Sequence, residues 1–237
     1  MPNFCEAKIR HLFSKIPANT SKLTHDIILI MFNIFKKSTK PTTEPTAYVF
    51  IGRSGAGKGT QVELFMEEFA RQSSNKLLHV ETGNLLREFI KGPLYIQKRA
   101  KEVLDIGGLM PESVAIDMWM NYLITNFTGK ESLIFDGTPR KLVEAHLLDD
   151  ALKFFKIPKY KVIYINATPE GCTERLLGRQ RSDDTKDAIA KRMEWFDREV
   201  LPCIEFFKQD KDCVVLDING EQTIEKVHAD IMKAVFA

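Results

Sequence analysis

From residue 47 onward, short apolar runs alternate with longer segments of helical periodicity. Runs that are apolar at every position predict strands buried on both faces, and helical segments between them predict crossovers in a parallel sheet. The pattern therefore predicts an α/β fold in which helices flank a five-stranded parallel sheet. The expected strands lie at residues 48–51, 77–80, 133–135, 162–165 and 214–216.

The segment between the second and third expected strands is too long for one crossover helix. Its largely helical character predicts an inserted helical lobe between these two strands.

Residues 1–46 differ from the rest of the chain. Residues 1–40 hold seven basic and two acidic side chains. Apolar residues from Ile9 to Ile16 have the spacing of a short amphipathic helix, and residues 38–46 are rich in Pro and Thr, as linkers are. We expect a poorly ordered extension and linker, with membrane-surface binding or an organelle transit peptide as alternatives.

Charge and cysteine content indicate which partners and which cellular location to expect. With 34 basic and 32 acidic residues, the net charge is +2, so we expect no nucleic-acid partner. The apolar run 27–35 is about half of the roughly 20 residues that span a membrane, and we expect no stable membrane insertion. The four cysteines form no C-x-x-C pair, which favours free thiols and a cytoplasmic location.

The first expected strand ends in a glycine-rich segment, the phosphate loop (Gly52-Arg-Ser-Gly-Ala-Gly-Lys-Gly-Thr60), and an amphipathic helical segment follows. Glycines allow successive backbone N–H groups to converge on phosphate oxygens, and the helix N-terminus adds its positive dipole end. Lys58 supplies a full positive charge for the β- and γ-phosphates. Gly59 stands where the strict motif has Ser or Thr, and Thr60 follows it.

The Gly-Lys-Gly-Thr form of this loop resembles that of adenylate kinases and related nucleoside monophosphate kinases, and the resemblance continues in order to the C-terminus. It implies a P-loop NTPase-type domain at 47–237, with a monophosphate-binding lobe at about 81–110 and a short lid at about 179–184. It also implies MgATP as donor and a monomeric enzyme. The implied ATP-binding residues are Gly55, Ala56, Gly57, Lys58, Gly59, Thr60, Arg175, Arg179, Gly220 and Gln222.

Three further segments resemble the acceptor side of the family. These are Thr82-Gly-Asn-Leu-Leu-Arg87, Gly107-Gly-Leu-Met-Pro111 and Asp136-Gly-Thr-Pro-Arg140. The resemblance implies that Arg87 and Arg140 grip the acceptor phosphate, as the planar guanidinium fork suits, and that Asp136 positions Mg²⁺ through water. The implied AMP-binding residues are Thr82, Arg87, Gly108, Leu109, Met110, Gly137, Arg140, Glu144, Arg181 and Arg192.

Five positions depart from the family pattern on this side. They are Glu81 for Ser, Asn84 for Asp, Met110 for Val (both apolar), Thr138 for Phe, and Glu144 for the glutamine that reads adenine. A carboxylate only accepts hydrogen bonds, so Glu144 suits the adenine N6 amine but not N1, whereas it suits the two donors of guanine.

Basic residues cluster after the fourth expected strand, and their spacing is similar to that of the family's lid. The resemblance implies that Arg175 packs over the ATP adenine and that the other arginines neutralise the transferring phosphates. The segment from Arg179 to Asp183 is too short for the zinc-bearing insertion of other members, so we expect no zinc. The implied catalytic residues are Lys58, Arg140, Arg179, Arg181, Asp183, Asp184 and Arg192.

The leading hypothesis is therefore a phosphotransferase with a phosphate group as acceptor, which converts MgATP and AMP reversibly to two ADP. A UMP/CMP kinase is one alternative, and Thr82 speaks against it because pyrimidine-specific relatives usually have Ala there. A GMP kinase is suggested only by Glu144. A catalytically inactive nucleotide-binding module is the alternative from another class, opposed by the presence of Lys58 and the arginines together.

Overall fold

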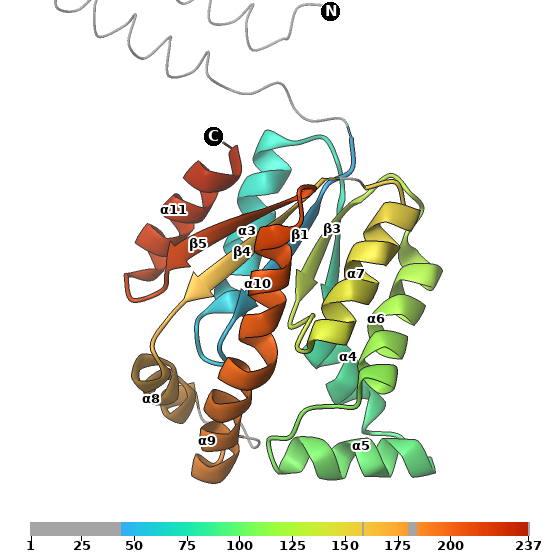
Figure 1. Cartoon of the computed structure of the whole chain (residues 1–237), viewed down its shortest axis with the longest axis vertical. Helices are drawn as coiled ribbons and strands as arrows, with labels where there is room; N and C mark the ends of the chain where they lie inside the picture. Colours follow the sequence, from blue (N-terminus) through green and yellow to red (C-terminus); the bar gives the residue numbers. More distant parts are fainter. Residues whose placement is uncertain (1–43, 158, 180–183, 237) are drawn as a thin grey trace, which may run out of the picture. The chain divides into compact units, whose positions relative to one another are not determined.

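The computed structural model describes residues 44–157, 159–179 and 184–236 and confirms the predicted α/β fold (Figure 1). All five expected strands form one parallel sheet in the order β2-β3-β1-β4-β5. The extension predicted at the N-terminus lies outside the described residues up to residue 43, and so do Arg181 and Asp183 of the predicted lid.

The strands and helices alternate along the chain as the apolar pattern predicts (Figure 1). In chain order the elements are β1 (Ala47–Gly52), α3 (Lys58–Gln72), β2 (Leu77–Glu81), α4 (Thr82–Phe89), α5 (Tyr95–Asp105), α6 (Glu112–Asn126), β3 (Ser132–Asp136), α7 (Leu142–Phe154), β4 (Tyr160–Asn166), α8 (Pro169–Arg179), α9 (Lys186–Trp195), the π-helical turn η1 (Phe196–Val200), α10 (Leu201–Gln209), β5 (Cys213–Asn219) and α11 (Ile224–Phe236).

Side chains of β1 alternate between two apolar cores, one on each face of the sheet. Val49 faces a core shared with α6, α7 and α10, where Trp119 packs edge-on against Phe135. Tyr48 faces a core shared with α3 and α11, where its ring centroid lies 4.9 Å from that of Phe65. Helices thus cover both faces of the sheet (Figure 1).

Burial differs between the central and edge strands. All residues of β3 are buried, whereas in β5 only Ile218 is buried and Val214 is 52% exposed. Each edge strand has one neighbour instead of two, so less of its surface is covered. The expectation of strands buried throughout is therefore correct for the centre of the sheet and wrong for β5.

Helices α4 and α5 surround a third, smaller apolar cluster that contains Leu86, Ala100 and Met110. These helices occupy the inserted segment between β2 and β3, where the length of the connection predicted a helical lobe.

The position of β1 locates the site. It lies next to β3, and the connections that leave these two strands run in opposite directions across the sheet, from β1 to β2 at one edge and from β3 to β4 on the other side of β1. In open parallel sheets a crevice forms at this point, outside the carboxyl ends of the strands, and ligands bind there. The loops that follow β1 and β3 both open into this crevice.

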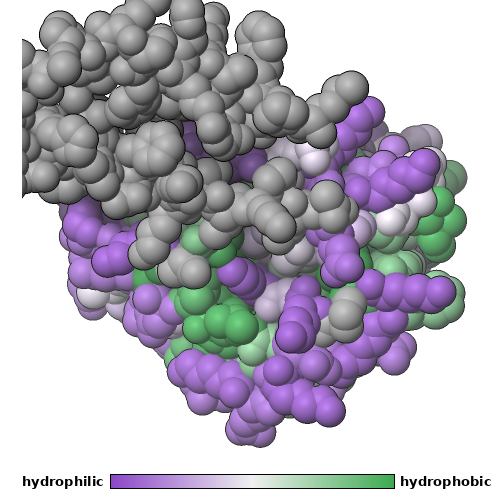
Figure 2. All heavy atoms as spheres, turned by 90° about the horizontal axis from the view of Figure 1, so that it is seen from above, coloured by the Kyte–Doolittle hydropathy of each residue, from purple (hydrophilic) through white to green (hydrophobic). Residues whose placement is uncertain are grey.

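Surface polarity is mixed on the face seen from above, where Figure 2 shows hydrophilic side chains with apolar groups in separate patches. No helix within the described ranges is long and apolar enough to cross a membrane.

Candidate functional site

The phosphate loop joins β1 to α3 and depends on two glycines in the left-handed backbone region. Gly55 has φ +85° and Gly57 has φ +91°. A Cβ on Gly55 would lie 2.4 Å from the carbonyl oxygen of Cys172, so no side chain fits there. Helix α3 begins at Lys58, within the loop, and its first three residues line the cleft, where a helix N-terminus favours an anion.

Lys58 is held inside this loop by its own backbone. Its Nζ donates hydrogen bonds of 2.8 Å to Gly52 O and 3.0 Å to Arg53 O. Burial lowers the pKa of Lys58 to about 8, although the nearby carboxylate of Asp136 opposes this shift. The ammonium group of Lys58 is thus desolvated, and an anionic ligand would bind it more strongly than these two carbonyl oxygens do.

Asp136 ends β3 and lies next to the phosphate loop. A Cβ on Gly59 would lie 4.0 Å from Oδ2 of Asp136. Among the described residues, no side chain or backbone group donates a hydrogen bond to this carboxylate, and Asp136 lines the same cleft as Lys58. Its oxygens are therefore available to the water shell of a hard cation, and carboxylate oxygens are the ligands that Mg²⁺ prefers.

Two arginines of the acceptor side reach the cleft from different elements. Nε of Arg140 donates to Gly137 O at 2.8 Å, which folds the side chain back over its own loop, and its guanidinium lies 5.7 Å from the centre of the Trp195 ring. Arg87, on α4, forms an ion pair of 2.8 Å with Glu81. Glu81, a departure from the family pattern, thus acts as counter-ion for the predicted phosphate-binding Arg87.

Glu144, at the start of α7, is buried with both carboxylate oxygens occupied. Oε1 accepts a 2.6 Å hydrogen bond from the Thr138 hydroxyl, and Oε2 accepts one of 2.6 Å from the backbone N–H of Arg140. The carboxylate therefore bridges the loop that carries Arg140. A base at this site would compete with Thr138 for Oε1.

A narrow pocket of 20 Å³ leads from Glu144 toward α4, and it is lined by the predicted base-contacting residues Thr82, Leu109 and Met110. This volume holds about one water molecule. The hydroxyl of Thr82 is buried beside the pocket and has no hydrogen-bond partner within the described part of the chain. The pocket beside Glu144 therefore has little free space in this arrangement of the helices.

Asp184 joins two of the predicted lid arginines. It accepts two hydrogen bonds from Arg179, at 2.9 and 3.0 Å, and one of 2.7 Å from Arg192. Its side chain is 1% exposed. Burial alone would raise the pKa of Asp184, but the hydrogen bonds and charges of Arg179 and Arg192 outweigh burial, and the pKa lies below its ordinary value.

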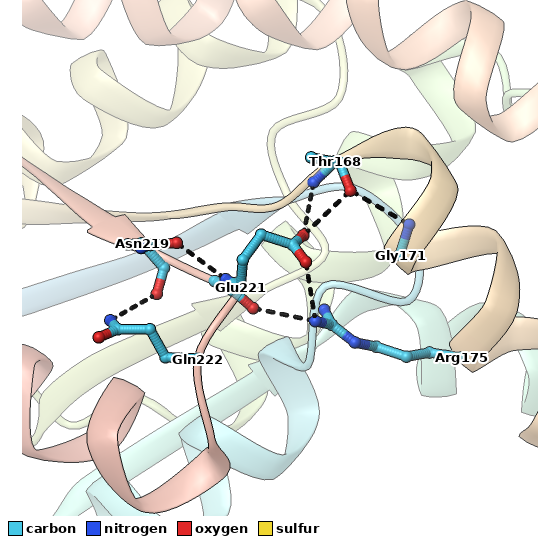
Figure 3. Close-up of polar contacts among 7 residues, drawn as sticks. Thr168, Gly171, Arg175, Asn219, Glu221 and Gln222 are labelled. Atoms are coloured by element: carbon cyan, nitrogen blue, oxygen red, sulfur yellow. Dashed lines mark hydrogen bonds and ion pairs between the residues drawn. The ribbon is translucent and has the colours of Figure 1, made fainter.

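Arg175 and the turn after β5 also line the cleft, and Figure 3 shows the polar contacts between them. The guanidinium of Arg175 donates a 3.1 Å hydrogen bond to Gly220 O. Gln222 donates 3.0 Å hydrogen bonds to Asn219 O and to Asp230. The three predicted residues Arg175, Gly220 and Gln222 are therefore brought together by α8 and the turn between β5 and α11.

Sequence reasoning missed Trp195, at the end of α9. Its Nε1 donates a buried 3.1 Å hydrogen bond to Gly107 O, and its ring lines the cleft beside Arg140. A Cβ on Gly107 would lie 2.7 Å from the backbone of Ala188, so the loop packs directly on α9. The sequence offered only one signal, an aromatic residue at the end of a helix in which half of the residues are charged.

One cleft of 630 Å³ brings most of these groups together. It joins the phosphate loop, the end of β3, α4, α8, α9 and the turn after β5. The predicted residues that line it are Gly55, Ala56, Gly57, Lys58, Gly59, Thr60, Arg87, Gly108, Asp136, Gly137, Arg140, Arg175, Arg179, Arg192, Gly220 and Gln222.

The family model described as adenylate kinase matches residues 50–212. The chain is 33% identical to an adenylate kinase of Prochlorococcus marinus over 187 residues, which cover 79% of this chain and 97% of that protein. It is 30% identical to an adenylate kinase of Oenococcus oeni over 189 residues, covering 79% of this chain and 96% of that protein. With the phosphate loop, the parallel sheet and the cleft, these matches show that the chain belongs to the adenylate kinase family.

Proposed function

We propose that this chain transfers a phosphoryl group from ATP to AMP and forms two ADP reversibly. The observation that carries this proposal is one cleft lined by Lys58 of the phosphate loop together with Arg140 and Arg192, which come from two other parts of the chain. Phosphoryl transfer needs in-line positioning and stabilisation of charge on the transferring oxygens, with little covalent chemistry by the protein.

Each cation has a role that its position supports. Lys58 lies where the β- and γ-phosphates of a donor would rest on the N-terminus of α3. Arg87 and Arg140 lie on the acceptor side and would hold the AMP phosphate. Arg179 and Arg192, held by Asp184, would exchange this carboxylate for the transferring phosphate. Arg181 and Asp183, outside the described residues, are proposed to complete this set.

Magnesium fits this arrangement. Asp136 presents carboxylate oxygens at the edge of the phosphate loop, and Thr60 lines the same cleft. When bound with ATP, Mg²⁺ neutralises charge on the β- and γ-phosphate oxygens. Asp136 would orient its water shell, while Lys58 holds the donor phosphates from the other side.

The acceptor site is proposed to open before AMP binds. The pocket beside Thr82 and Glu144 has room for about one water molecule, so the base can enter only when α4 and α5 swing outward. We propose residues 81–110 as the moving monophosphate lobe and residues 179–184 as the lid. Closure of both excludes water, which would otherwise accept the phosphoryl group.

Thr82 supports AMP as acceptor. Its buried hydroxyl lacks a partner in the described structure and lines the acceptor pocket, where it can bond to a purine base. We also propose that the enzyme acts as a monomer in the cytoplasm, on the general nucleotide pool.

A coupled assay of ADP formation from MgATP and each of AMP, UMP, CMP and GMP tests the proposal. AMP is expected to give the highest kcat/KM, with loss of activity when Mg²⁺ is chelated by EDTA. A higher kcat/KM for UMP or CMP would assign a pyrimidine nucleotide kinase. Absence of turnover with all four acceptors would leave an inactive nucleotide-binding protein.

A further inference from the structure

Glu221 joins two elements of the donor end that the chain separates widely. Its Oε1 accepts a 2.7 Å hydrogen bond from the backbone N–H of Thr168 and one of 3.2 Å from the Thr168 hydroxyl. Its Oε2 lies 3.5 Å from the guanidinium of Arg175. Figure 3 shows the carboxylate between the start of α8 and the Arg175 side chain.

We infer that Glu221 is a positioning residue for the donor nucleotide, which fixes α8 and the Arg175 guanidinium against the turn that receives the base. The inference rests on the proposed function, because it places the donor base between Arg175 and this turn. Glu221 touches neither phosphate nor acceptor groups in this arrangement, so its effect should be confined to the donor.

The carboxylate is well placed to hold the start of α8. It accepts from a backbone N–H next to the helix N-terminus, where a negative charge is favoured by the helix dipole. The Thr168 hydroxyl in turn accepts a 3.1 Å hydrogen bond from the N–H of Gly171. Glu221 therefore fixes the helix that carries both Arg175 and Arg179.

Hydrogen bonds of the backbone hold the turn after β5 in place without the Glu221 carboxylate. Glu221 N donates to the Asn219 side chain at 2.9 Å, and Gly220 N donates to Asn166 O at 2.7 Å. The turn is thus fixed in position, and the Glu221 carboxylate holds α8 against it. Without the carboxylate, Arg175 keeps only its hydrogen bond to Gly220 O, and its long side chain regains rotational freedom.

The space beside Gly171 also supports this role of Glu221. A Cβ at this position would lie 3.0 and 3.1 Å from the two carboxylate oxygens of Glu221. At Gly178, in the same helix, no atom of the described residues lies within 4 Å of the corresponding position. The helix therefore leaves room for the Glu221 carboxylate at Gly171, and Gly178 has no such neighbour in the described part of the chain.

Calorimetric binding of MgATP without acceptor tests the inference independently of turnover. Glu221→Ala should weaken ATP binding about fivefold, as expected when a partly exposed carboxylate and its contacts to Thr168 and Arg175 are lost. Glu221→Gln should weaken it less, because its carbonyl still accepts from Thr168 N–H. AMP binding should change by less than about twofold. Glu170→Gln is the matched control, since exposed Glu170 on the same helix start has no hydrogen bond or ion pair among the described residues.

A double-mutant cycle sharpens the test. Gly171→Ala should weaken ATP binding, whereas Gly178→Ala should not. The effect of Gly171→Ala should be smaller in the Glu221→Ala background, where only the Thr168 hydroxyl remains close, at 3.2 Å from the added Cβ. Equal ATP affinity in Glu221→Ala and Glu170→Gln would overturn the inference. So would parallel losses of ATP and AMP affinity, which would indicate a general structural role. If the wild-type protein binds ATP but turns over no acceptor, the proposed function fails while the positioning role is still decided by binding.

Discussion

The hydroxyl of Thr138 lies 2.6 Å from Oε1 of Glu144, and both side chains are buried. Each of these residues departs from the pattern of the family, and in the sequence they look like two separate changes. In the structure they are partners, because the hydroxyl that replaces the aromatic ring donates to the carboxylate that replaces the glutamine. The second oxygen accepts from Arg140 N–H, so the pair stabilises the loop that carries Arg140.

Glu144→Gln should therefore be tolerated far better than Glu144→Ala. The amide can accept from Arg140 N–H and donate to the Thr138 hydroxyl, so AMP binding should change by no more than about 1–2 kcal/mol. Alanine leaves both donors unpaired and should lower the free energy of unfolding by about 2–3 kcal/mol. Urea unfolding and KM for AMP measure these effects.

Equal damage from both substitutions would contradict the bridging role of Glu144. A preference for GMP over AMP in kcat/KM that Glu144→Gln reverses would identify Glu144 as a guanine reader and overturn the assignment of AMP.

Lys58→Met should abolish most activity while the protein stays folded. The missing charge acts mainly in the transition state, so turnover should fall by several orders of magnitude. Because burial of the charged lysine costs stability in the folded protein, thermal stability should not decrease. Near-normal turnover in this variant would remove the phosphate loop from the mechanism.

The pKa of Lys58 predicts a pH dependence of donor use. Its value of about 8 in the folded protein means that kcat/KM for ATP should fall as pH rises above 8, because the neutral amine no longer attracts phosphate. Lys58→Arg stays charged and should show no such fall between about pH 7.5 and 9.5, whatever its absolute rate. Parallel profiles for the two proteins would assign the fall to another group.

The lowered pKa of Lys58 also determines how the free energy of unfolding changes with pH. The ordinary pKa of lysine is 10.5, so the unfolded chain binds more protons at this residue between pH 8 and 10.5. Through Lys58, the free energy of unfolding should rise with pH over this window, and Lys58→Met should remove that rise.

Asp184→Asn should destabilise the region of the lid arginines. The substitution leaves Arg179 and Arg192 without their shared counter-charge, and it should cost about 2–3 kcal/mol at neutral pH, less than a fully buried pair because Arg179 is partly exposed. Because the pKa of Asp184 lies below 3.8, the wild-type advantage is present above about pH 4 and disappears as pH falls through the lowered value.

Urea unfolding from about pH 7 to 3 measures this difference, with Asp187→Asn as control, since Asp187 is an exposed carboxylate in the first turn of α9. An advantage of wild type that persists undiminished at pH 3 would show that the charge of Asp184 is not its source.

Removal of residues 1–30, so that the chain begins at Met31, should leave activity and thermal midpoint unchanged. Every strand pair and apolar cluster of the described structure forms among residues 46–236. A large loss of either activity or thermal midpoint would indicate that residues 1–30 pack against the domain.

Much of the fold and the donor site could be predicted from the sequence because their signals are local. Apolar runs identify buried strands wherever their partners lie, and all five predicted strands are present. The phosphate loop needs only glycines, a lysine and a helix that follow one another, and Gly55 and Gly57 adopt the positive φ angles that such a loop requires. Burial of the edge strands was overestimated, since an apolar run does not reveal how many neighbours a strand will have.

Side-chain partners across the site were decided only by the tertiary structure. Glu221 meets Thr168 across 53 residues, and Trp195 meets Gly107 across 88. Glu144 turns toward Thr138 and Arg140 because the chain folds back from β3 into α7. A hydrogen bond depends on atoms within about 3 Å of each other. The sequence determines which groups are available for such bonds, but the packing of helices on the sheet decides which of them meet.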